Sequence, residues 1–171
     1  MEDKTCLPQS DDNYETKIVR STNDLPPAHD HYTFQIKNFS LLLAMTDEKC
    51  HSGQFEVGGY QWQLKLYPKG EGKGADTSLS LYLRLDDSEI LPPNRKLYAK
   101  GKLRIRDQIN NNHLENTVEH WFSNPGIGYG FSNLLSLREL HDTSKDYLVG
   151  DVLFVECKIV VISVVKNFSS N

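Results

Sequence analysis

The chain has 171 residues, of which 38% are hydrophobic and 25% charged, and its formal net charge is −4 at pH 7. This length predicts one domain that can bury a core without disulfides or metals, and the negative charge gives no overall attraction to nucleic acid. The most apolar run, residues 152–165, is too short to cross a bilayer and is interrupted by charged and polar residues. We therefore expect neither nucleic-acid nor membrane partners.

The cysteines, Cys6, Cys50 and Cys157, form an odd set without CxxC spacing. This favours a reducing compartment and gives no zinc pattern. The first residues, MEDKTCLPQSDD, are polar and acidic, unlike a secretory signal peptide. We expect a cytoplasmic protein, with the nucleus as the alternative location, and we expect no cofactor and no metal.

Residues 1–28 are rich in Asp, Ser, Asn and Pro and have almost no periodic apolar positions, which predicts a disordered or loosely attached tail. From residue 31 the sequence HYTFQIK alternates apolar and polar side chains and predicts a first strand. The folded domain is expected over residues 29–166, with a short C-terminal tail at 167–171.

Residues 55–70, FEVGGYQWQLKLYPKG, show the clearest alternation in the chain. Gly58 and Gly59 permit the positive φ angles of a tight hairpin. The strand that follows has one apolar face, which consists of Tyr60, Trp62, Leu64 and Leu66. Residues 68–77 are rich in Gly and Lys and predict a flexible loop.

Two further half-buried strands are predicted over residues 78–87 and 96–109, because apolar side chains fill one face of each. Tyr82 falls on the other face of the first strand. The other face of the second strand is basic and carries Lys100, Lys102, Arg104 and Arg106.

The remaining residues predict two strands and one helical turn. A strand over residues 117–122 places Trp121 out of phase with its apolar face. Ser132 is expected to cap a short helical turn through Leu135, and residues 147–165 form the last strand. Seven or eight strands at this spacing predict an all-β antiparallel sandwich. The order in which the strands pair does not follow from these patterns.

Five segments, in this order and spacing, resemble a meprin and TRAF homology (MATH) domain: HYTFQIKNFSLL, FEVGGYQWQLKLYPKG, SLSLYLRL, the YGF at 129–131, and DYLVGDVLFVECKIVV. The chain is most similar to the stand-alone MATH proteins of plants, and the resemblance covers about residues 29–166. It implies an eight-stranded TRAF-like β-sandwich with a shallow groove that binds short extended peptides. Family members recruit substrates to ubiquitin ligases, form parts of deubiquitinases or act as receptor adaptors.

The resemblance also implies which residues line the groove. A groove phenylalanine of a well-known member falls on Gly101, and residues 126–128 are uncharged where that relative has polar contacts. The implied peptide-binding residues are Tyr82, Trp121, Tyr129, Gly130 and Phe131.

The patterns themselves place Tyr82 and Trp121 outside the core, because both are out of phase with the apolar faces of their strands. With Tyr129 and Phe131 they are expected to form one exposed apolar patch, as binding sites do. The alternatives are that Trp121 covers an edge of the sandwich, that Tyr82 is an ordinary surface aromatic, and that residues 129–131 tuck over one end.

The basic stripe on residues 100–106 is most often simply a solvated face. If it borders the groove, Lys100 and Lys102 belong to the peptide site and favour an acidic or phosphorylated ligand. The alternation puts the stripe on the same face as Tyr82, whereas the resemblance puts Gly101 in the groove. The sequence leaves this conflict open.

No catalytic residues are predicted. Cys50 and His51 are adjacent and would point to opposite faces of an extended segment, and no Ser/His/Asp set, carboxylate pair or phosphate loop is present. His29 and His31 could share a face, but two histidines are weak evidence for a metal. We expect a non-enzymatic protein, with a cysteine-dependent hydrolase as the least favoured option.

The predicted function is capture of linear peptide segments of other proteins, with an extension to substrate recognition in ubiquitin-related pathways. A single groove binds weakly without avidity. The sequence shows neither a BTB-like segment nor a coiled coil, so this chain alone is expected to be monomeric. The alternative is a carbohydrate-binding β-sandwich that uses the same rings as sugar platforms, with the turn at Asn110–Asn112 nearby.

Overall fold

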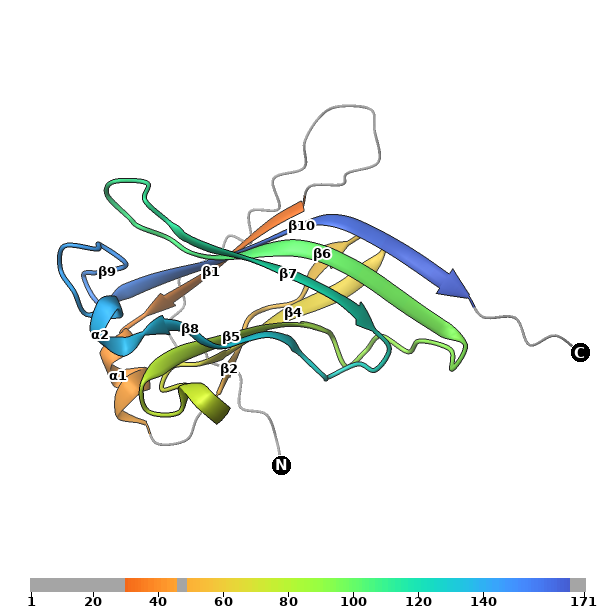
Figure 1. The fold of residues 1–171 in the computed structure, drawn as a ribbon, viewed down its shortest axis with the longest axis horizontal. Helices are drawn as coiled ribbons and strands as arrows, with labels where there is room; N and C mark the ends of the chain where they lie inside the picture. The colour runs from red at the N-terminus through yellow and green to blue at the C-terminus, as the bar shows by residue number, and fades with distance from the viewer. Residues whose placement is uncertain (1–29, 46–48, 167–171) are drawn as a thin grey trace, which may run out of the picture.

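The computed structural model describes residues 30–45 and 49–166, and within them ten strands form two five-stranded sheets that face each other (Figure 1). The first sheet has the order β1 (Asp30–Lys37), β10 (Val152–Lys166), β6 (Arg95–Ile105) and β7 (Leu114–Phe122), with β9 (Leu148–Val149) beside β10. The second has the order β2 (Cys50–His51), β4 (Tyr60–Tyr67), β5 (Ser78–Leu85) and β8 (Tyr129–Ser136), with β3 (Phe55–Val57) beside β4.

Every strand pair is antiparallel, so the predicted all-β antiparallel sandwich is confirmed. The two main paths contain eight strands, and β3 and β9 are short additions to them. The predicted hairpin before the central strand is also confirmed, because Gly58 (φ 62°) and Gly59 (φ 80°) form the turn between β3 and β4.

The core lies between the inner faces of the two sheets. Trp62 is fully buried and packs edge-on against Phe122, with ring centroids 5.2 Å apart, and so joins β4 of the second sheet to β7 of the first. Its indole nitrogen donates a hydrogen bond to the Val57 carbonyl at 3.1 Å, which satisfies the one polar atom of the ring. The leucines predicted to face inward are buried: Leu64, Leu66, Leu79, Leu81, Leu83 and Leu85.

The helices differ from the prediction. Residues 132–135 belong to β8, and the helical turn follows as α2 (Leu137–Leu140), where the Ser136 hydroxyl accepts a hydrogen bond from the Glu139 amide. This Ser-x-x-Glu spacing is a capping signal, so the predicted cap is four residues too early. A second helix, α1 (Phe39–Ala44), was not predicted.

The predicted flexible loop after β4 is instead a folded turn that contains the 3₁₀ turn η1 (Gly72–Gly74). A Cβ atom at Gly70 would lie 2.1 Å from the Ser78 carbonyl oxygen, and one at Gly74 would lie 1.7 Å from that of Ser132. The glycines of this segment therefore serve close backbone packing more than flexibility.

The described cysteines differ in state. Cys157 is a buried free thiol, and its burial raises its pKa to about 12. Cys50 is buried and disulfide-bonded. The predicted tails and Cys6 lie outside the described residues. Among those residues, no helix is both long and apolar enough to cross a membrane.

Candidate peptide-binding edge

The strands β7 and β8 are the last strands of their sheets, and they lie on the same side of the sandwich (Figure 1). β8 pairs with β5 along one edge, and no described strand pairs with its other edge. An unpaired edge offers main-chain donors and acceptors to an added strand. The open edge of β8 is therefore the centre of the candidate site.

Aromatic rings connect the two strands at this edge. The Tyr129 ring, at the start of β8, stacks on the ring of His120 from β7 with centroids 4.1 Å apart and planes within 4° of parallel. His120 also packs edge-on against the core ring of Phe122 at 5.0 Å. Burial lowers the pKa of His120, which keeps the imidazole neutral at neutral pH. Tyr129 remains 43% exposed, so its outer face is free for a ligand.

Gly130 lies directly opposite Tyr82 in the β5 and β8 pair. A Cβ atom at Gly130 would lie 2.1 Å from the Leu81 carbonyl oxygen, and one at Gly128 would lie 2.9 Å from the Tyr82 Cβ. The close approach of β8 to β5 therefore requires glycine at both positions. It also leaves the side of Tyr82 toward the free edge without a covering side chain.

Tyr82 is half-buried on the outer face of the second sheet. Its ring packs edge-on against Tyr67 with centroids 6.1 Å apart. Burial raises the pKa of Tyr82 most, and a hydrogen bond to the Glu71 carboxylate raises it further. The hydroxyl thus stays protonated and fixed, and the ring is a rigid surface beside β8.

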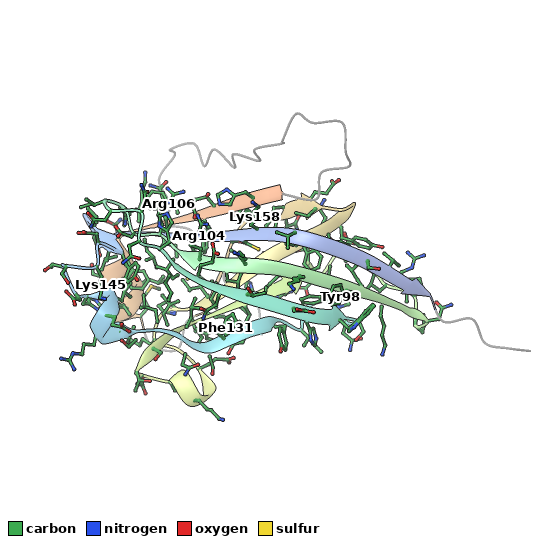
Figure 2. The ribbon with its side chains drawn as sticks, turned by 45° about the horizontal axis from the view of Figure 1, so that its top comes forward. Tyr98, Arg104, Arg106, Phe131, Lys145 and Lys158 are labelled. Carbon is green, nitrogen blue, oxygen red and sulfur yellow. The ribbon has the colours of Figure 1, made fainter. Side chains whose placement is uncertain are left out.

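Phe131 and Tyr129 pair with Leu81 and Leu83, whose side chains face the core, so both rings lie on the inward side of β8. Phe131 packs partly against the core (Figure 2). Ile127, two residues before Tyr129, is 62% exposed and was not singled out from the sequence. Ile127 lies two residues before Tyr129 and four before Phe131, so the three share one face of an extended segment. This spacing is the sequence signal that indicates Ile127.

Trp121 lies elsewhere, on the outer face of the first sheet, where it pairs with Tyr98 of β6. It is 43% exposed and lies near the end of β7, which is an edge strand of the sandwich. Lys100 and Lys102 share this face and form ion pairs with Glu119 at 3.4 Å and Glu115 at 2.6 Å. These are the charges that were expected beside Tyr82.

The four predicted rings therefore do not form a single patch. Tyr82 and Trp121 lie on the outer faces of opposite sheets, which are separated by a layer about 10 Å thick. Tyr129 and Phe131 lie at the edge between them. The sequence located outward-facing rings, but without the strand order it could not tell which sheet carried each.

Gly101 does not lie in an open groove. It faces inward on β6, where a Cβ atom would lie 2.7 Å from the Lys158 carbonyl oxygen. The register between β10 and β6 shifts between Ile159 and Val161 at this point. This irregularity resolves the conflict between the alternation and the resemblance in favour of the alternation.

The turn at residues 110–112, which the carbohydrate alternative places near the exposed rings, lies far from Trp121. The segment 110–112 precedes β7, whereas Trp121 is close to the end of that strand. At about 3.4 Å per residue, the strand from Leu114 to Trp121 alone spans roughly 24 Å, so the turn and Trp121 are too far apart to share one sugar ring.

The described residues contain no group of three or more His, Cys, Asp or Glu side chains placed to hold a metal. His31 instead faces the Glu156 carboxylate at 3.7 Å, and His29 lies outside the described residues. Cys50 is buried and disulfide-bonded, so it cannot act as the thiolate of a cysteine hydrolase in this state.

A two-sheet antiparallel sandwich with an open, ring-lined edge defines a class of β-sandwich interaction domains. Residues 31–159 match the family model described as "MATH domain". The chain belongs to the MATH domain family, whose domain is a protein–protein interaction module and is generally non-catalytic.

Individual relatives agree with this assignment. The chain is 33% identical over 158 residues to "Ubiquitin C-terminal hydrolase 12" of Arabidopsis thaliana, covering 90% of the chain and 14% of the relative. It is 37% identical over 131 residues to a "MATH domain and coiled-coil domain-containing protein" of the same plant, covering 76% of the chain and 37% of the relative. The chain thus spans well under half of either relative.

Among solved structures, Notothenia coriiceps TRAF5 matches with a TM-score of 0.64 and 21% identity, covering 82% of this chain and 77% of that one. This likeness shows the TRAF-like fold, which the sequence had predicted.

Proposed function

We propose that the chain is a peptide-binding module in which an extended segment of a partner protein lies along the open edge of β8. The observation that carries the proposal is the combination of that edge with Tyr129, which is half-exposed at its start and held by the His120 stack. Main-chain pairing gives affinity in this mode of binding, and side-chain contacts give selectivity.

Each side of an added strand meets a different surface. On the inward side, the alternate peptide residues contact Ile127, Tyr129 and Phe131, which favours apolar side chains. On the outward side, the peptide passes the bare backbone of Gly130 and reaches the ring of Tyr82. Small or polar residues fit this side, because β8 approaches β5 so closely there.

The proposal also includes the cellular role of the peptide-binding module. The relative named as a ubiquitin C-terminal hydrolase supports a role in substrate recognition in ubiquitin-related pathways, without catalysis by this chain. A single edge binds weakly, so avidity through a larger assembly would raise the affinity. A cytoplasmic location, with the nucleus as the alternative, is part of the same proposal.

A peptide-display selection on the folded chain tests the proposal. Tyr129→Ala should lower the affinity for selected peptides at least tenfold, in line with the roughly 2 kcal/mol typical of an anchor residue. Trp121→Ala is the matched control, because Trp121 is also 43% exposed but lies on the other sheet, and it should leave these peptides bound. Peptides that bind Tyr129→Ala as tightly as the unmodified chain would overturn the proposal.

A further inference from the structure

We propose that the outer face of the first sheet is a second, separate interaction surface, which binds an extended acidic segment with an aromatic or apolar residue at one end. We call it the basic face and define it by the outward side chains of β6, β7 and β10 together with Arg106. It lies on the opposite side of the first sheet from the core, so it does not depend on ligand binding at β8.

The basic face is positive although the chain as a whole is negative. Its outward positions carry three carboxylates, Glu115, Glu119 and Glu156, and six cations, which leaves a net charge of +3 against −4 for the whole chain. The cations are Lys96, Lys100, Lys102, Arg104, Arg106 and Lys158.

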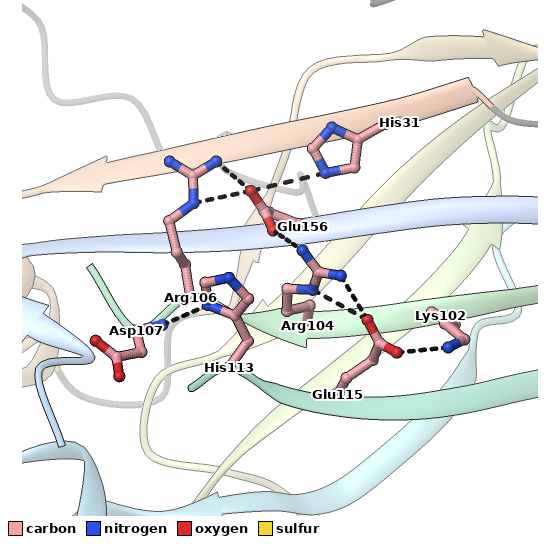
Figure 3. A network of polar contacts seen from close by, with 8 residues as sticks. All are labelled: His31, Lys102, Arg104, Arg106, Asp107, His113, Glu115 and Glu156. Atoms are coloured by element: carbon pink, nitrogen blue, oxygen red, sulfur yellow. Dashed lines mark hydrogen bonds and ion pairs between the residues drawn. The ribbon is translucent and has the colours of Figure 1, made fainter. Parts of the chain in front are cut away.

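Each carboxylate already pairs with cations around it: Glu119 lies 3.4 Å from Lys100, and Figure 3 shows the partners of Glu115 and Glu156. Glu156, whose side chain is only 4% exposed, pairs with Arg104 at 3.3 Å and also with Arg106. Glu115 pairs with Arg104 at 2.7 Å and with Lys102 at 2.6 Å. The network therefore fixes the two guanidinium groups in place and leaves excess positive charge facing solvent.

Two cations of the basic face have no partner within the described part of the chain. Lys158 is exposed and lies across from Lys102, and Lys96 is exposed at the start of β6. Neither forms an ion pair or a side-chain hydrogen bond with any described residue. An acidic segment would supply the charges that these lysines lack.

An aromatic anchor lies in the same row. The rings of Tyr98 and Trp121 are 5.1 Å apart and tilted by 53°, and Tyr98 donates its hydroxyl hydrogen to Glu119, which fixes its ring. Figure 2 shows Tyr98 toward one end of β6 and Arg104 toward the other. Exposed Trp, Tyr and Arg are the residue types most often found at interaction hot spots.

The spacing of the row favours an extended ligand. Outward residues of a strand recur about every 6.8 Å, and alternate side chains of an extended peptide recur at the same interval. A segment with acidic residues at every second position can thus place successive carboxylates over successive cations of β6. Its end then reaches the Tyr98 and Trp121 pair.

The test uses the full chain and a fluorescent decapeptide in which Glu alternates with Ser and one Trp stands at an end. The control peptide carries Gln in place of Glu. The Glu peptide should bind with an affinity that falls at least tenfold between 50 and 300 mM salt, as expected for exposed charges, and the Gln peptide should bind at least tenfold more weakly.

Variants locate the site. Lys158→Glu and Trp121→Ala should each lower the affinity at least fivefold. Lys73→Glu, which reverses an exposed charge in η1 beside β5 and β8 of the second sheet, and Tyr129→Ala should not change it. Lys158→Glu places a carboxylate opposite Lys102, so the fold is preserved, and thermal unfolding checks this.

Three results would overturn the inference. The first is equal binding of the Glu peptide to Lys158→Glu and to the unmodified chain. The second is loss of binding in Tyr129→Ala, which would assign the acidic peptide to the β8 edge. The third is a single-stranded oligonucleotide that binds as tightly as the Glu peptide, which would reduce the basic face to unspecific charge.

Discussion

Replacing Glu156 by glutamine tests how much the buried ion-pair network contributes to stability. The carboxylate lies between His31 at 3.7 Å and the guanidinium groups of Arg104 and Arg106, and its side chain is 4% exposed. Burial by itself raises the pKa of this group, but the hydrogen bonds and positive charges of His31 and Arg106 outweigh burial and lower the pKa to about 2. The charged carboxylate is therefore more stable in the folded chain than in the unfolded chain.

The magnitude follows from this pKa. A fall from 4.5 to about 2 corresponds to about 3 kcal/mol of folding free energy at neutral pH. Because the folded pKa is depressed, this contribution is complete above pH 4.5 and is lost as the pH falls toward 2. Glu156→Gln should therefore cost about 2–4 kcal/mol at pH 7, and the difference from the unmodified chain should shrink steadily below pH 4.5.

Urea unfolding at pH 7, 5, 4 and 3 measures this difference. The matched control is Glu115→Gln, which also removes contacts to Arg104 but from a side chain that is 27% exposed. Solvent screens this group, so the control should cost less than about 1 kcal/mol. If Glu156→Gln is as stable as the unmodified chain at pH 7, or if its loss of stability does not change with pH, the electrostatic reasoning is wrong.

Three further outcomes are expected. Trp62→Ala should cost about 3–5 kcal/mol in urea unfolding because the ring is fully buried, whereas Trp121→Ala should cost less than about 1 kcal/mol; similar losses would contradict their placement. Gly130→Ala should lower stability by about 1–3 kcal/mol, since the new methyl group meets the Leu81 carbonyl, and unchanged unfolding would show that β8 can move away. The Cys157 thiol should resist a thiol reagent until the chain unfolds, because it is buried with a pKa of about 12; rapid labelling of the native chain would refute this.

The sequence predicted the inward faces of the strands well, because a period of two is a local property. Trp62 and the leucines of β5 are buried as their alternation required, and Tyr82 and Trp121 do point outward. The hairpin at Gly58 and Gly59 was also predicted from local turn chemistry. The family resemblance supplied the fold that the strand patterns could only narrow to a sandwich.

Features that depend on distant residues were not predictable in the same way. The strand order decides that Trp121 and Tyr82 lie on different sheets, and no local pattern encodes it. Helix α1 was missed because its cap comes from far along the chain: the Asp151 carboxylate accepts hydrogen bonds from the Ser40 amide at 2.9 Å and from its hydroxyl at 2.6 Å. The basic stripe was recognised, but its partners Glu115 and Glu156 belong to other strands.

The position of β10 between β1 and β6 affects how the chain folds during synthesis. β1 is made first among the described strands, yet it pairs with β10, which begins 115 residues after β1 ends. At about 5–20 residues per second, a ribosome needs roughly 6–23 seconds to synthesise that interval. The second sheet and the β6 and β7 hairpin can form during this time. The edge of β1 stays unpaired until β10 has been made. Pairing of β1 in the first sheet must therefore wait for the synthesis of β10, and a nascent chain halted before β10 leaves β1 without its partner strand.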